Sequence, residues 1–342
     1  MERKDTGENR RGRLAGIDFV RCACAVIIVC YHYSCSSTNP YHFFAATANG
    51  TWGDLVVTVF FAVSGACLYA SYPALEGRPA LKRYFLRRWK AIFPMFYLAF
   101  AFFYLSNVLH TGTFFYEPRV SPWSLILTVF GLDGYLIYRI PNYFIIGEWF
   151  LGAIILLYCL YPLVLRAMKV RFLMPLLLLA GYYLVLETGI FRILPFRNLI
   201  ICLGSFYLGM VMAKHRGFFF ENRVFPWACM ALFLLLAIVP LPVPLNQYVV
   251  LLMQFEGVLL FVSLAFIGRF LERFKVHRGI RWIAGLSYPV FLLHHQIVLR
   301  LLHRTDPVTL LPAAGMYLVS ILASLAAAFL LSRLLRRQGH SF

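Results

Sequence analysis

Two ionisable side chains lie in an apolar stretch near the start of the chain. Residues 16–34 read GIDFVRCACAVIIVCYHYS, with Arg21 and His32 eleven positions apart. At about 100° per residue, eleven steps exceed three turns by roughly 20°, so both side chains project from one face of a helix, roughly 16 Å apart along its axis. Ionisable groups inside a membrane segment are costly and usually face a bundle interior or a wet cavity. A neutral imidazole at such a position could accept a proton from a hydroxyl, so this stripe predicts a site.

Each of these residues also has a structural interpretation. Arg21 could extend to the membrane interface, and His32 could be a polar contact between helices. Asp18 lies one turn before Arg21, and the two could pair to offset the cost of charge burial. Taken alone, each residue leaves the choice open, but their position on one stripe favours a site.

A second group of polar residues lies in the stretch LSYPVFLLHHQIVLR near the end of the chain. His294 and His295 are adjacent, so in a helix they point about 100° apart, and we expect at most one of them to face the site. Ser287 shares a face with His294, two turns earlier. A structural hydrogen bond to a neighbouring helix is the more common role of such a histidine.

Three basic residues, Arg87, Arg88 and Lys90, directly precede the apolar Ile92–Phe93–Pro94. Guanidinium groups bind phosphates in bidentate fashion, so one interpretation is a phosphate-binding cluster at the inner membrane face. The other is the excess of Lys and Arg that sets the orientation of any membrane protein. Charge alone does not separate the two.

Two acids stand in apolar surroundings. Glu256, in LLMQFEGVLLF, lies near the middle of a predicted span, so we expect it to be paired, protonated or part of a site. Glu148 begins the stretch EWFL at the outer end of another span. With Ser287 and His294, these acids are the candidates for the lining of a binding site or cavity. We expect no metal site, because the adjacent His294 and His295 lack ligand spacing and the eight cysteines resemble neither a zinc site nor a disulfide framework.

The composition places these residues in a membrane. Of the 342 residues, 61% are hydrophobic and only 13% are charged, which excludes an ordinary soluble domain. Repeated apolar runs of about 18–22 residues predict an all-α, polytopic transmembrane helical bundle. The net charge is +18, but the basic residues cluster in short segments between apolar runs. This pattern indicates topology and anionic lipid rather than nucleic acid.

The spacing of apolar and basic segments predicts ten spans in one transmembrane domain, 1–342, with both termini in the cytoplasm as tails at 1–15 and 333–342. The predicted helices cover residues 16–34, 53–73, 91–109, 149–168, 173–188, 199–213, 225–240, 248–267, 285–302 and 309–332.

The apolar run at 125–138 is short and interrupted by Gly131, Asp133 and Gly134. A full crossing there would reverse the following helix and leave Arg166 and Lys169 outside. We therefore predict a re-entrant or interfacial segment after the third helix, with a full crossing as the alternative.

Several short stretches keep a fixed order over roughly residues 14–300. They are Asp18–Phe19–Val20–Arg21 followed by His32, then Phe60–Phe61–Ala62–Val63–Ser64–Gly65, Arg87–Arg88 with Ile92–Phe93–Pro94, Trp149–Phe150–Leu151 with Leu160–Tyr161–Pro162, and Ser287–Tyr288 through Phe291–Leu292 and His294. No single stretch is specific, but the ordered set resembles the membrane-bound acyltransferase family 3, the bacterial O-acetyltransferase-type proteins.

This resemblance implies a ten-helix bundle with a re-entrant loop in the bacterial inner membrane. It also implies transfer of an acyl group, usually acetyl, from cytoplasmic acyl-CoA to a hydroxyl of an extracytoplasmic or lipid-linked carbohydrate. Acetyl-CoA would be a co-substrate, with no bound cofactor. By carry-over, His32 is the catalytic base, Arg21 serves donor binding or positioning, and Arg87 and Arg88 match the family's cytoplasmic basic motif. Family members often have an arginine three residues before the proline, where this chain has Ala91.

Two other functions stay open at this point. A transporter or flippase of a polar or glycolipid solute would line its path with the buried charges, although the lack of an internal repeat argues weakly against inverted-repeat transporters. An interaction protein would use the same polar residues only structurally. No serine or cysteine nucleophile has a triad context, so within the enzymatic interpretation direct transfer is favoured over an acyl-enzyme. The acceptor, the acyl chain and the oligomeric state stay undetermined.

Overall fold

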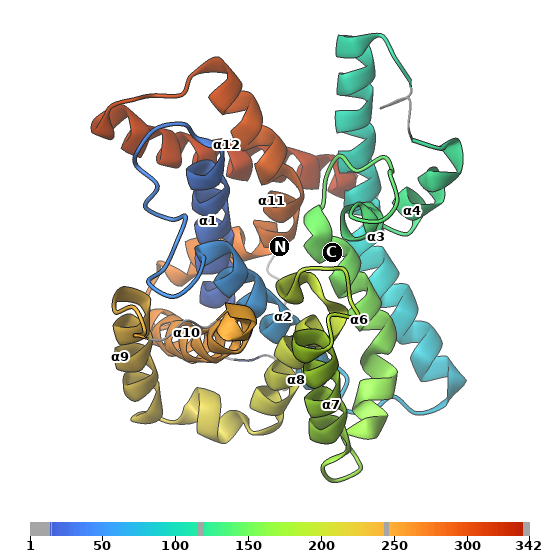
Figure 1. The fold of residues 1–342 in the computed structure, drawn as a ribbon, viewed down its shortest axis with the longest axis vertical. Coiled ribbons are helices and arrows are strands. Elements are labelled where there is room, and N and C mark those ends of the chain that lie inside the picture. Colours follow the sequence, from blue (N-terminus) through green and yellow to red (C-terminus); the bar gives the residue numbers. More distant parts are fainter. Residues whose placement is uncertain (1–13, 15, 115–119, 243–245, 338–342) are drawn as a thin grey trace. The chain divides into compact units, whose positions relative to one another are not determined.

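A computed structural model describes residues 14, 16–114, 120–242 and 246–337, and most of these residues lie in helices (Figure 1). The longer helices are α1 (Ile17–Ser36), α2 (Trp52–Ser71), α3 (Gly77–Thr111), α6 (Glu148–Ala167), α7 (Leu173–Glu187), α8 (Leu199–Lys214), α9 (Phe225–Ile238), α10 (Val249–Leu271), α11 (His277–Arg304) and α12 (Leu310–Arg337). Each corresponds to one predicted helix, so the all-α class is confirmed. The predicted tails, 1–15 and 333–342, lie largely outside the described residues.

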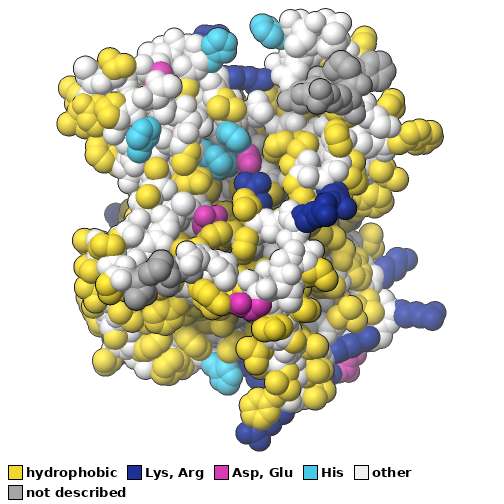
Figure 2. All heavy atoms as spheres, viewed as in Figure 1, with side chains coloured by type: hydrophobic (Ala, Val, Ile, Leu, Met, Phe, Trp, Pro, Cys, Tyr) yellow, Lys and Arg dark blue, Asp and Glu magenta, His cyan; other side chains and the backbone are white. Residues whose placement is uncertain are grey.

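Within the described ranges, seven helices are long and apolar enough to cross a membrane: α1, α2, α3, α6, α10, α11 and α12. Helices α7, α8 and α9 have 15, 16 and 14 residues, fewer than the ~20 that an untilted span needs. Figure 2 shows hydrophobic side chains over much of the visible surface, as lipid contact requires. The chain is a membrane protein, while the number of ten spans stays a prediction.

Helix α3 is much longer than its predicted span of 91–109. It begins at Gly77 and continues for 35 residues through the basic segment and through Pro94. Leucine, alanine, lysine and arginine all favour helix, so the chain has no reason to break where the apolar run begins. At 1.5 Å per residue the helix is about 50 Å long, well beyond the ~30 Å hydrocarbon core.

The apolar run at 125–138 forms two short helices, α4 (Leu125–Val129) and α5 (Asp133–Leu136), after a 3-10 turn at Pro122–Ser124. Between them Gly131 has a φ of +66°, which glycine adopts without strain. Neither helix is long enough to cross a bilayer. Whether the segment re-enters the membrane stays a prediction.

The described helices fall into two compact units. The first comprises Met1–Ile27, Ala46–Leu75 and Leu163–Gly285, and the second comprises Ile28–Ala45, Glu76–Pro162 and Leu286–Phe342. Helices α1, α6 and α11 each contribute to both units, since a unit boundary falls inside them. That residues 1–342 form a single functional domain stays a prediction.

In the first unit, α2 packs closely against α8 through glycines. A Cβ atom at Gly65 would lie 1.9 Å from the carbonyl oxygen of Phe206, and one at Gly209 would lie 1.9 Å from that of Ala62. Small residues allow helix backbones to approach this closely in membranes. The Phe60–Gly65 stretch therefore has a packing role here.

In the second unit, Asp306 ties the connection after α1 to the connection before α12. Its carboxylate accepts hydrogen bonds from the Ser37 hydroxyl at 2.6 Å, and from the Thr38 amide at 2.6 Å and hydroxyl at 2.8 Å. Burial would raise the pKa of Asp306, but these hydrogen bonds outweigh it and hold the pKa below its ordinary value. These hydrogen bonds fix the position of the C-terminal end of α1, which carries His32.

Candidate active site

Three imidazole rings and one carboxylate meet in the second unit. His32 comes from the last part of α1, Glu148 from the first turn of α6, and His294 and His295 from the middle of α11. The His32 ring centre lies 4.8 Å from that of His294 and 4.7 Å from that of His295. The cluster thus joins three segments that are far apart in the sequence.

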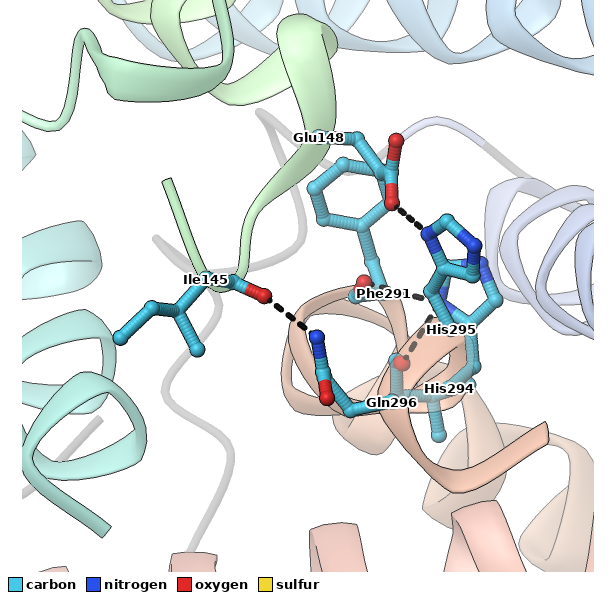
Figure 3. A network of polar contacts seen from close by, with 7 residues as sticks. Ile145, Glu148, Phe291, His294, His295 and Gln296 are labelled. Carbon is cyan, nitrogen blue, oxygen red and sulfur yellow. Dashed lines mark hydrogen bonds and ion pairs between the residues drawn. The ribbon is translucent and has the colours of Figure 1, made fainter. Parts of the chain in front are cut away.

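Glu148 and His295 form a direct pair (Figure 3). The Glu148 carboxylate accepts a hydrogen bond from Nδ1 of His295. A carboxylate can only accept here, so the proton sits on Nδ1, and Nε2 of a neutral His295 keeps its lone pair. This is how a carboxylate orients a histidine for proton transfer.

The backbone presents Glu148 in an unusual conformation. Gly147 has a φ of +90° and Glu148 itself a φ of +43°, in the left-handed region that residues other than glycine seldom adopt. The turn leads into the N-terminus of α6, whose dipole favours a negative charge. Gln296 of α11 donates to the carbonyl oxygen of Ile145 at 2.8 Å, which ties this turn to α11 (Figure 3).

His294 is fully buried and its orientation is fixed by its own helix. Its Nδ1 lies 3.1 Å from the carbonyl oxygen of Val290 and 2.8 Å from that of Phe291. Carbonyl oxygens only accept, so Nδ1 carries the proton. Its Nε2 is buried and has no hydrogen-bond partner among the described residues. A buried lone pair of this kind is an acceptor without a donor.

His32 is half-buried. Its ring centre lies 5.2 Å from that of Tyr31, and the ring also contacts the two α11 histidines. Within the described part of the chain, neither ring nitrogen of His32 takes part in a hydrogen bond. No described residue therefore occupies either nitrogen, and a neutral ring can take a hydroxyl proton.

The sequence did not single out His295 as a site residue. We expected at most one of the adjacent α11 histidines to face the site, yet both rings contact His32. The reason is geometric, because one ring from α1 can touch two side chains that diverge by about 100°. Sequence spacing gave no signal for this, since the partner ring comes from another helix.

The predicted basic group divides by exposure. Arg87 and Lys90 are exposed, whereas Arg88 is half-buried with its guanidinium 5.8 Å from the ring centre of Tyr158 on α6. The Tyr84 hydroxyl donates to the Tyr158 carbonyl oxygen at 2.8 Å, which reinforces this contact between α3 and α6. Arg88 thus supports packing, and the other two present charge outward.

The remaining candidates occupy other places. Ser287 is half-buried on α11, two turns before His294. Arg21 lies in the first unit, where its guanidinium donates to the Cys67 sulfur at 3.4 Å. Glu256, also in the first unit, is fully buried, and neither of its carboxylate oxygens has a hydrogen-bond partner among the described residues.

One known protein family matches nearly the whole chain. Comparisons with curated proteins and with solved structures gave no significant match. The family described as an acyltransferase domain, acyltransferase family 3, matches residues 14–333, a range that contains every member of the cluster around His32. The chain therefore belongs to acyltransferase family 3, and it is a membrane acyltransferase.

Proposed function

We propose that this protein moves an acyl group, acetyl in the simplest case, from cytoplasmic acyl-CoA to a hydroxyl of an extracytoplasmic or lipid-linked carbohydrate. The membrane is the bacterial inner membrane, with both termini in the cytoplasm. The observation that carries the proposal is His32, an imidazole with both ring nitrogens unbonded in the described structure, at the centre of a histidine and carboxylate cluster. Membership of an acyltransferase family supports the reaction class.

His32 acts as the general base in this proposal. One ring nitrogen takes the proton of the acceptor hydroxyl while its oxygen bonds to the thioester carbonyl carbon. The carbon–sulfur bond then breaks, and the CoA thiolate takes the proton back, which yields an ester and free CoA. A positioned base of this kind contributes roughly 10²–10⁴-fold to the rate.

The donor is held from the inner face. Arg87 and Lys90 offer exposed positive charge in the first half of α3, and guanidinium and ammonium groups suit the phosphates of CoA. Arg88 and Arg21 serve to position the donor or the helices around it. Glu148, Ser287 and His294 border the acceptor side, with Glu256 as a further cavity candidate.

The test is acyl transfer by purified protein in lipid nanodiscs. Labelled acetyl-CoA is supplied with a panel of lipid-linked and soluble sugars, and wild type is compared with His32→Ala. We expect wild type to consume thioester and label an acceptor, with a loss of roughly 10²–10⁴-fold in the variant. His303→Gln, at the exposed end of α11, is the matched control and should behave as wild type.

Equal transfer by wild type and His32→Ala would remove His32 as the base. An absence of thioester consumption with every acceptor would overturn the enzymatic proposal, and uptake or flipping of the same sugars would then indicate transport.

A further inference from the structure

We propose that Glu148 and His295 form a carboxylate–imidazole dyad that stabilises the imidazolium formed on His32 during acyl transfer. This inference rests on the proposed function of His32 as the base. It assigns His295 a role and gives Glu148 one more specific than lining a cavity. Both act through His32 and are positioning residues.

The geometry links the three groups in a row. The Glu148 carboxylate accepts from Nδ1 of His295, and the His295 ring lies 4.7 Å from the His32 ring, with 32° between the ring planes. The side chain of Glu148 is only 18% exposed and that of His295 is 32% exposed. Water therefore screens this row of groups only in part.

The charges explain why the row matters. A carboxylate paired with a neutral imidazole has a net charge of −1, held beside His32 with no cation among the contacts of His32 that the structure describes. When His32 takes the hydroxyl proton, it becomes the missing cation. Charge that appears during the reaction is stabilised best by groups already in place, and partial exclusion of water strengthens the effect. When the thiolate recovers the proton, the row returns to its starting charge.

The surrounding structure keeps the dyad in position. The Phe150 and Phe291 rings pack edge to face at 5.0 Å, which joins α6 to α11 beside the pair. The Gln296 hydrogen bond to Ile145 holds the turn before α6 from the other side. A left-handed φ at Glu148 is tolerated only where such contacts compensate for it. An ion pair on the protein surface would not need these packing contacts or this backbone conformation.

The experiment compares kcat and KM for acetyl-CoA in wild type, Glu148→Gln, Glu148→Asp and His295→Phe, all in nanodiscs. Glu148→Gln removes the charge and keeps the shape, so we expect kcat to fall roughly 10²-fold with KM nearly unchanged. Glu148→Asp restores the charge and should recover part of that loss. His295→Phe keeps a ring against His32 but cannot hold the carboxylate, so we expect a comparable fall in kcat.

The dyad should also act as a unit. The double variant Glu148→Gln with His295→Phe should lose little more than either single variant, because both remove the same stabilisation. Glu187→Gln, which changes an exposed carboxylate on α7, is the matched control and should leave kcat unaltered.

The outcomes separate this inference from the proposed function. If His32→Ala is inactive while Glu148→Gln retains the wild-type kcat, the dyad is wrong and the base stands. The dyad would also be wrong if Glu148→Gln changed only the KM for acetyl-CoA. The same holds if Glu148→Asp recovered no activity although it elutes and melts as wild type does. If Glu148→Gln does not fold, His295→Phe decides, because a wild-type kcat there contradicts the dyad. If wild type consumes no thioester, both proposals fall together.

Discussion

At the residue scale, exposure and partners distinguish the basic residues that spacing had grouped. Arg88 is half-buried against Tyr158, so its substitution would disturb packing as well as charge. Arg87 and Lys90 are exposed on α3, so their substitution tests charge with little effect on packing. They are therefore the informative positions for donor binding.

We predict that Arg87→Gln and Lys90→Gln each raise the KM for acetyl-CoA by up to about five-fold, since an exposed ion pair contributes about 0.2–1 kcal/mol. The effect should shrink as salt is added, because screening weakens exposed charges. Steady-state kinetics at two salt concentrations measure it. Lys275→Gln, also exposed, is the control, and unchanged KM values in both variants would show that these charges only set topology.

At the element scale, the helices are placed by close backbone contacts as well as by hydrophobic side chains. The α2–α8 contact depends on Gly65 and Gly209, where any side chain would meet a carbonyl oxygen of the facing helix. Within a bilayer, such packing replaces the hydrophobic effect as the force that joins helices. The glycine of the Phe60–Gly65 stretch is therefore a stability residue.

We predict that Gly65→Ala destabilises the protein by about 1–3 kcal/mol, because the new methyl group must push α2 and α8 apart. Thermal unfolding in detergent measures the change. Gly285→Ala is the matched control, since Gly285 lies inside α11 with open space around it, and alanine favours helix there. Equal melting temperatures for Gly65→Ala and wild type would contradict the close contact.

At the scale of the whole molecule, charge and hydropathy determine how the chain is threaded through the bilayer. The segment between α3 and α6 is decisive, because a crossing there would reverse the direction of α6. Its described residues, 112–114 and 120–147, contain only short helices, α4 and α5 among them. With most basic residues assigned to the inside, both ends of this segment should lie outside.

We predict that Thr113→Cys and Ile140→Cys, in a background without the native cysteines, both react with a membrane-impermeant maleimide added outside intact cells. Both positions are exposed in the described structure. Arg278→Cys should react only after the membrane is permeabilised, and serves as the inside control. Labelling of the first two positions from opposite sides would show that the segment crosses.

The sequence by itself determined the helical class, the approximate position of every long helix and the family, because hydropathy and helix propensity act over neighbouring residues. It also singled out His32, since an imidazole in an apolar run is visible without a structure. It misjudged the start of α3, where helix propensity continues past the apolar boundary. Only the tertiary structure decided that Glu148 meets His295 and that both α11 histidines touch His32. These residues are up to 263 positions apart, and their contact depends on how α1, α6 and α11 pack, which no local pattern specifies.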